Sequence, residues 1–285
     1  MAGVRPLVLA GAGLVATVMS AQAADLPPVS QGAAPLVEGF GGGWYLRGNI
    51  GFSSPSVGSL SNPQDATTSS FRYLDKGFDA APLLGVGVGY QASPWLRAEL
   101  TGEYHGAANF HGFEVWTGSI GAPPVAATGT DAYSASQSDW VVLANVFADL
   151  GTWWGATPFV GAGAGLADVT ISHFHDQGTV TTLAAGTTPA AGALGGSIST
   201  WNFAWALYAG FAYKVTPSLT LELAYRYLDL GSGKSGDLVD SITGIDYGAM
   251  SFNHLSSQDL MLGMRWMLDP GPPRQEQFTP LVSKG

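Results

Sequence analysis

Seven charged side chains at alternating strand positions form the only group in this sequence that could carry chemistry. Glu99 and Glu103 stand four residues apart, a spacing that places both carboxylates on one face of a β-strand. A hydrolytic pair needs one protonated and one ionised carboxyl group. Neighbouring arginines would keep both ionised, so the pattern favours a network of salt bridges over catalysis. The full set is Arg47, Arg97, Glu99, Glu103, Glu222, Arg226 and Arg265.

The histidines are the candidates for metal or haem binding. His173 and His175 have the spacing of some metal contacts, but the sequence has no cysteine and only Asp176 stands beside them. We therefore expect surface histidines, no metal and no cofactor. All are expected at or beyond the outer ends of predicted strands: His105, His111, His173, His175 and His254.

No other motif predicts a reaction. The glycines of Gly161–Gly165 superficially suggest a nucleotide-binding loop, yet they lie within a strand pattern and no helix pattern follows them. No nucleophile stands beside a base in a recognisable motif. The sequence thus predicts no catalytic, cofactor-binding or metal-binding residue, and the protein is not expected to be an enzyme.

Composition excludes several classes of protein. The chain carries 21 acidic residues against 11 Lys and Arg, a net charge of −10, so nonspecific binding to nucleic acid is not expected. Only 11% of the residues are charged, against roughly 25% in soluble domains. After the first residues there is no apolar stretch long enough for a membrane-spanning helix. Such a chain must hide its hydrophobicity in the alternation of β-strands.

The N-terminus has the anatomy of a cleaved secretory signal. Arg5 precedes the apolar run Leu7–Met19, and the small-x-small site Ala21-Gln22-Ala23 follows. An N-terminal membrane anchor is the alternative, but the run is short for a span. The predicted organisation is a signal peptide at 1–23, a periplasmic Pro/Gly-rich segment at 24–43, a barrel at 44–268 and a periplasmic tail at 269–285.

Eight segments alternate apolar and polar residues with a period of two. In the clearest, Trp95–His105, Leu96 and Leu100 face one side while Arg97 and Glu99 face the other. Each segment has about the 9–11 residues that a tilted strand needs to cross a bilayer. The segments are Trp44–Phe52, Pro82–Tyr90, Trp95–His105, Asp139–Leu150, Pro158–Ser172, Trp201–Tyr213, Leu219–Leu230 and Asp259–Leu268.

The connectors between these segments alternate in length. Three are short turns, such as Gln91–Pro94. Outer-membrane barrels have short periplasmic turns and long outer loops in this order, with outward aromatic residues at both ends of the strands. Both features are present here. The long connectors, rich in Gly, Ser, Thr and Asp, are Ser53–Ala81, Gly106–Ser138, His173–Thr200 and Gly231–Gln258.

These patterns predict an all-β fold, an eight-stranded antiparallel up-and-down transmembrane β-barrel with short periplasmic turns and four long extracellular loops. A soluble lipocalin-like barrel is the alternative. Eight strands enclose an interior just wide enough for side chains. Inward charges must pair there, and inward glycines such as Gly85, Gly87 and Gly89 would leave room for long side chains. We expect a lumen plugged by salt bridges, with a small conduit and a hydrolytic carboxylate pair as alternatives.

Five stretches stand out as a group: Ala24–Pro28, Gly43–Gly48, Thr157–Gly165, Leu223–Tyr227 and Gly263–Trp266. They resemble the small outer-membrane barrel proteins of alphaproteobacteria, a surface-antigen family often described as porins. The resemblance covers the signal, strands and turns up to Leu268 and leaves out the long loops. It implies an eight-stranded outer-membrane barrel and no reaction. The chain departs from the family where Asp269 begins a tail, since such barrels usually stop at an aromatic residue.

The expected function is that of a non-enzymatic integral protein in the outer membrane of a Gram-negative bacterium. Its role would be envelope integrity and surface contacts made by the long loops. A porin-like channel for small solutes and a lipid-A-modifying enzyme are the alternatives. The expected partners are outer-membrane lipid and lipopolysaccharide, and the barrel-assembly machinery during insertion, but no nucleic acid. The partner of the loops is not predicted.

Overall fold

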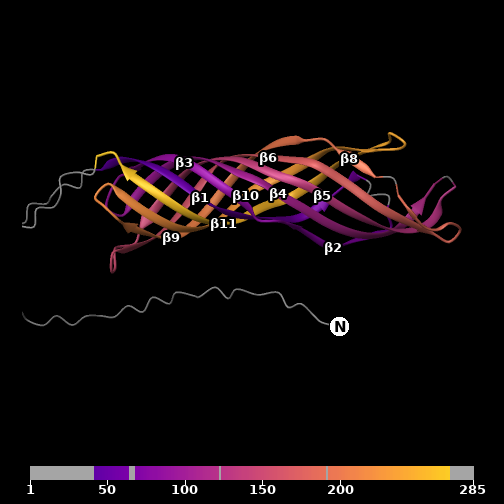
Figure 1. Cartoon of the computed structure of the whole chain (residues 1–285), viewed down its shortest axis with the longest axis horizontal. Helices are drawn as coiled ribbons and strands as arrows, with labels where there is room; N and C mark the ends of the chain where they lie inside the picture. The colour runs from indigo at the N-terminus through magenta and orange to yellow at the C-terminus, as the bar shows by residue number, and fades with distance from the viewer. Residues whose placement is uncertain (1–41, 64–67, 122, 191, 270–285) are drawn as a thin grey trace, which may run out of the picture. The chain divides into compact units, whose positions relative to one another are not determined.

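Eight antiparallel strands close into a ring in the computed structural model, which describes residues 42–269 except 64–67, 122 and 191 (Figure 1). The predicted signal peptide lies outside the described residues, as do nearly all of the N-terminal segment and of the tail. The ring order is β1, β3, β4, β5, β6, β9, β10 and β11, and β11 pairs back onto β1. Among the described residues no helix could cross a membrane. The predicted fold class is confirmed.

The ring strands are longer than predicted. Three short strands add to the ring: β2 (Ser70–Phe78) pairs with β4, β7 (Gly186–Pro189) with β6, and β8 (Ala193–Gly195) with β6 and β10. The ring strands are β1 (Gly43–Ser61), β3 (Ala81–Gln91), β4 (Leu96–Ile120), β5 (Val125–Asp149), β6 (Ala156–Thr182), β9 (Ile198–Lys214), β10 (Leu219–Asp240) and β11 (Asp246–Met267).

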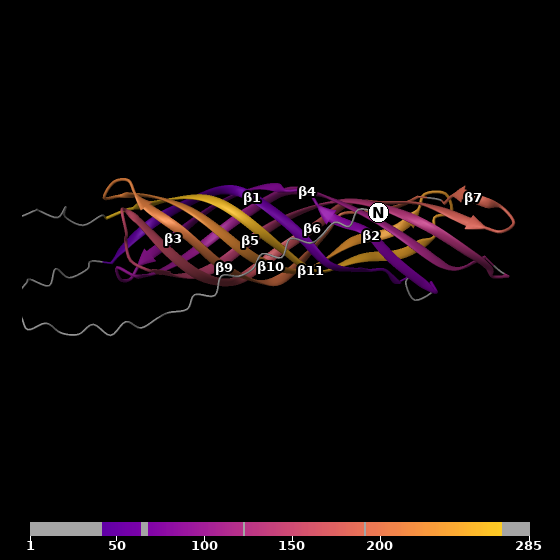
Figure 2. The ribbon, with the colours of Figure 1, turned by 90° about the horizontal axis from the view of Figure 1, so that it is seen from below.

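The two ends of the barrel differ, as Figure 2 shows in side view. We call the end that holds the turns 92–95, 150–155 and 215–218 the short-turn end, and the opposite end the hairpin end. The turn after β3 is closed by the N–H of Ala92, which donates to the carbonyl oxygen of Leu96 over 2.9 Å. At the hairpin end β4 and β5 stay paired as far as Ile120 and Val125.

The four long connectors are therefore strands for much of their length. The alternation continues into them but changes phase at β-bulges. On β4, for example, inward residues carry odd numbers as far as His105 and even numbers from Ala108, with a register shift between the two. β6 shifts in the same way at His173, whose φ of 52° is left-handed, whereas β5 keeps its odd-numbered residues inward along its whole length. The period-two patterns of β4 and β6 stop at these bulges, which is why the sequence placed the ends of these two strands there.

The outer face of the ring is apolar along its central part. Leu84, Leu100 and Leu262 point outward and are exposed. Aromatic side chains lie at both ends of this belt, as the sequence predicts. Trp44 and Tyr90 are in ring contact at 5.2 Å near the short-turn end, and Tyr104 and Trp140 at 4.9 Å toward the hairpin end. This arrangement matches the girdles of membrane barrels.

Candidate functional site

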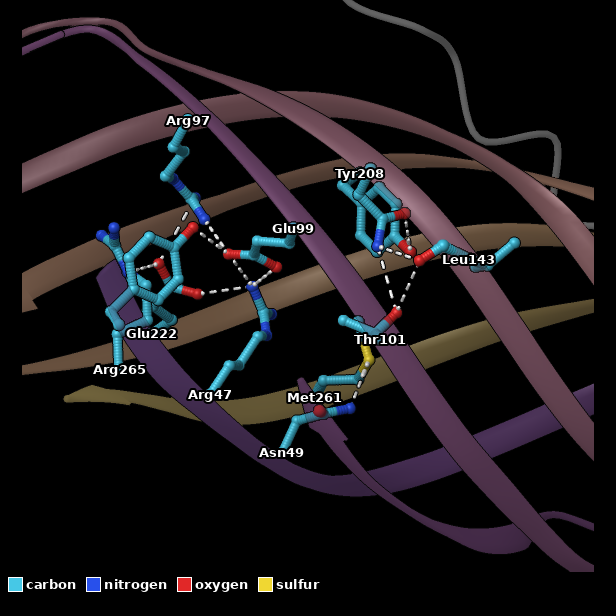
Figure 3. Close-up of polar contacts among 12 residues, drawn as sticks. Arg47, Asn49, Arg97, Glu99, Thr101, Leu143, Tyr208, Glu222, Met261 and Arg265 are labelled. Atoms are coloured by element: carbon cyan, nitrogen blue, oxygen red, sulfur yellow. Dashed lines mark hydrogen bonds and ion pairs between the residues drawn. The ribbon is translucent and has the colours of Figure 1, made fainter. Parts of the chain in front are cut away.

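All seven predicted charged residues lie in the lumen and are buried. Figure 3 shows five of them: Arg47, Arg97, Glu99, Glu222 and Arg265. Their exposed fractions run from 0% for Arg97 and Arg226 to 6% for Arg265. They come from β1, β4, β10 and β11, strands that the ring closure brings around one narrow interior. The structure thus brings the whole predicted set together in two clusters along the barrel. We call the cluster nearer the short-turn end the lower cluster and the one nearer the hairpin end the upper cluster.

The lower cluster consists of Arg47, Arg97, Glu99, Asp149, Glu222 and Arg265. Glu99 lies 2.8 Å from Arg47 and 2.6 Å from Arg97. Glu222 lies 2.7 Å from Arg265 and also within 3.3 Å of Arg47 and Arg97. Three arginines thus face three carboxylates, since Asp149 lies 3.2 Å from Arg97. Such a balanced set can be buried because each charge has an opposite neighbour.

The upper cluster consists of Glu103, His105, Asp139, Arg226 and Asp259. Arg226 Nη1 donates to Glu103 over 2.6 Å and its Nε to Asp259 over 2.7 Å. His105 lies 3.7 Å from both Glu103 and Asp139. The upper cluster therefore contains one arginine and three carboxylates. Its net charge is −2 when His105 is neutral and −1 when His105 is an imidazolium.

His105 corrects a prediction. The sequence placed it among surface histidines, but it is only 2% exposed. Its odd number on β4 gives it the inward parity of Glu103 and Arg97, so the signal was present at the strand end. Asp139 and Asp259 also have inward parity at the ends of their predicted segments. These three residues belong to the network that sequence reasoning limited to seven side chains.

Aromatic rings fill the space around the guanidinium groups. The guanidinium carbon of Arg97 lies 4.1 Å from the centre of the Phe147 ring and 4.8 Å from that of Phe159, a cation–π geometry. A Cβ at Gly161 would overlap the Phe147 ring, and one at Gly89 would overlap Tyr45. The inward glycines therefore leave room for aromatic side chains that cover the charges.

Glu99 and Glu103, the carboxyl pair that the sequence offered as an alternative for hydrolysis, are each bonded to arginine. Glu99 accepts hydrogen bonds from Tyr45, Arg47 and Arg97. Glu103 accepts them from Asn49 and Arg226. Both glutamates thus have arginine donors in similar surroundings, whereas a hydrolytic pair needs two carboxyl groups in different environments.

A second interior layer lies beyond the upper cluster, toward the hairpin end. Phe110 contacts Phe78 at 5.0 Å and Phe252 at 5.1 Å between ring centres, and Phe174 contacts Phe252 at 6.1 Å. We call these four residues the aromatic layer. Sequence reasoning missed it, because Phe110, Phe174 and Phe252 stand in the connectors that were expected to be loops. Restarting the alternation at Ala108 would have found Phe110.

Nearer still to the hairpin end, acidic side chains lie inside the wall. Glu114, Asp131 and Asp176 come from β4, β5 and β6, and the Tyr133 hydroxyl donates to Glu114 over 3.2 Å. Burial raises the pKa of Asp131 to about 6, although a hydrogen bond from Trp116 opposes the shift. Burial, with repulsion from Asp131 and Glu114, raises the pKa of Asp176 to about 7.

The remaining histidines give no metal centre. His173 and His175 are exposed on the outer surface, while Phe174 between them is buried and Asp176 faces inward beside Tyr133. His173 and His175 therefore lie on the opposite face of the barrel wall from the Asp176 carboxylate. In the described part of the chain no three His, Cys, Asp or Glu side chains are grouped to hold a metal ion.

A family model described as "Outer membrane protein beta-barrel domain" matches residues 11–253. An uncharacterized protein of Brucella abortus is 31% identical over 236 residues, which cover 78% of this chain and 80% of that protein. An uncharacterized protein of Brucella melitensis matches to the same extent.

Two solved structures illustrate the matches found at low identity. Neisserial surface protein A is 14% identical, with a TM-score of 0.38, over 79% of this chain and 98% of its own. The outer membrane protein OprG from Pseudomonas aeruginosa is 13% identical, with a TM-score of 0.42, over 79% and 95%.

Proposed function

Because the chain belongs to the outer membrane protein β-barrel domain family, we propose that it is an integral outer-membrane protein with a closed lumen and a structural and surface role. Its work is to maintain the envelope and to present the hairpin end for contacts outside the cell. Its lipid environment includes lipopolysaccharide, and the barrel-assembly machinery inserts it. The charged lumen residues act as a plug.

The observation that carries this proposal is that two layers fill the lumen in series. The first contains the lower and upper clusters, in which Arg97 and Arg226 are fully buried. The second is the aromatic layer, where Phe110, Phe174 and Phe252 are buried. An eight-stranded ring has little interior volume beyond that of its side chains, so these layers leave no room for a wide column of water.

Planar-bilayer recording tests the proposal directly. The purified wild-type chain should give no steady conductance steps. Flotation of the same preparation with lipid vesicles checks that the protein has inserted, so that a silent bilayer is informative. Stable, porin-sized steps from the unmodified chain would instead favour a channel for small solutes.

We also propose that the protein is not an enzyme, since Glu99 and Glu103, the candidate hydrolytic pair, are each paired with arginine. Mass spectrometry of lipid A from cells with and without the protein tests this. The two lipid A profiles should be the same. A mass change that requires the protein would support the lipid-modifying alternative.

A further inference from the structure

Asp168 places an acidic side chain on the outer, lipid-side face of the barrel wall. On β6 its neighbours Ala167 and Val169 are buried inside the ring, while Leu166 and Asp168 share the outward parity. The lumen charges therefore have no part in neutralising it. An outward acid so close to an apolar belt needs a reason, because carboxylates are costly near lipid.

Two tryptophans flank Asp168 on the neighbouring strands. Trp140 of β5 pairs in register with Asp168, which pairs in register with Trp201 of β9. Both indoles are outward and largely exposed, at 60% and 65%. Cross-strand neighbours on one face lie within reach of each other. The carboxylate thus stands between two aromatic side chains.

This row marks the boundary between lipid and water. The adjacent outward row toward the short-turn end is apolar and consists of Val142, Leu166 and Phe203, paired in register. The adjacent row toward the hairpin end is polar and consists of Ser138, Thr170 and Ser199, with the last two hydroxyl oxygens 2.6 Å apart. Lipid headgroups lie at such a boundary, where tryptophan is also favoured.

The carboxylate lacks a partner of its own. Asp168 Oδ1 is buried and accepts no hydrogen bond from any residue that the structure describes. A buried acceptor without a donor is unfavourable. The negative charge attracts cations, and so do the faces of the two indoles. Charge and aromatic surface therefore select the same kind of ligand.

We propose that Trp140, Asp168 and Trp201 bind the ammonium group of an outer-leaflet lipid headgroup. The ammonium pairs with the Asp168 carboxylate and lies against the indoles. The acyl chains continue over Val142, Leu166 and Phe203, which is why the ligand is a lipid rather than a free amine. This site goes beyond the proposed function and does not depend on a closed lumen.

Native mass spectrometry of the full chain in a nonionic detergent tests the site. The probes are phosphatidylethanolamine and phosphatidylglycerol with identical acyl chains, so that only the headgroup differs. The wild type should prefer phosphatidylethanolamine by about tenfold, the order expected for a cation held by a carboxylate and aromatic rings. Asp168→Asn should remove the preference and Trp201→Ala should reduce it.

Two variants control for charge and folding. Asp229→Asn removes another outward aspartate near the hairpin end, one whose Oδ1 already accepts a hydrogen bond from the N–H of Gly231 over 3.1 Å. It should keep the preference, as should Asp168→Glu, which retains the carboxylate. Equal binding of the two lipids by the wild type, or a preference unchanged in both Asp168→Asn and Trp201→Ala, would overturn the proposal. So would competition by free ethanolamine at concentrations equal to those of the lipid.

Discussion

At the scale of single residues, the lumen depends on shared partners. Glu222 contacts three arginines at once, and Arg226 contacts two carboxylates and His105. Removing one member of such a set leaves a buried charge with fewer partners. The stability lost is larger than the net contribution of the intact pair to folding, because the remaining charged group cannot return to water.

Glu103→Ala should therefore destabilise the barrel by about 3–5 kcal/mol. The substitution leaves Arg226 fully buried with Asp259 as its remaining carboxylate contact. Reversible urea unfolding in lipid vesicles measures the change, with Asp237→Ala, an exposed acid on β10, as the matched control. A cost no greater than that of the control would mean that the buried pair is not needed.

Leu100→Arg should cost roughly 2–4 kcal/mol in the same assay, as expected for a cation near the bilayer midplane. Leu74→Arg is the matched control. The two leucines are almost equally exposed, at 53% and 51%, but Leu74 lies on β2, beyond the apolar belt. Equal costs for the two variants would mean that the lipid-facing surface is misassigned.

At the scale of elements, the sequence predicted the eight ring strands but not the parts of these strands that extend to the hairpin end. The alternation Arg97, Glu99, Glu103 set the inward parity of β4 correctly, and the same rule holds for Arg265 on β11. Beyond His105 a bulge shifts the phase by one residue, and a shift of one turns every side chain to the other face. Phe110 and Glu114 were missed because of this phase shift. The composition of the segment, rich in Gly and Ser, also resembles that of a loop.

The acidic residues at the hairpin end should make that end sensitive to pH. Because the folded-state pKa values of Asp131 and Asp176 are about 6 and about 7, both above the roughly 3.9 of a free aspartate, the protonated forms favour folding. Their stabilising contribution is full below about pH 4 and is lost as pH rises through 6 and 7. The groups facing them are Glu114, Tyr133 and Trp116.

Hydrogen exchange provides the measurement. After correction for intrinsic rates, amides of the outer parts of β4, β5 and β6 should exchange faster at pH 8 than at pH 5. In Asp176→Asn this difference should shrink. Amides near Leu143, within the apolar belt, serve as the internal reference. Protection that is constant or rises with pH would contradict the prediction.

At the scale of the whole molecule, the two filled layers act one after the other. Opening the layer of charged clusters leaves the aromatic layer in place, since the two layers have no residue in common and Phe78 and Phe174 come from β2 and β6, which supply none of the charges. Glu103→Ala, although destabilised, should therefore conduct no more than the wild type in planar bilayers. Steady conductance should appear only when Phe110→Ala and Phe252→Ala are added to it. Steps from Glu103→Ala alone would mean that the charged clusters form the single barrier.

The β1–β11 pairing has a consequence for biogenesis. Tyr45 meets Met267 in register, so the first and last strands of the ring must find each other across nearly the whole barrel sequence. In a chain that is still emerging into the periplasm, β11 is not yet present, so one edge of β1 stays unpaired. Open edges attract other chains, and two incomplete copies could exchange strands there. We therefore expect that the open edge of β1 is protected until the last strand arrives, an expectation that follows from the connectivity alone.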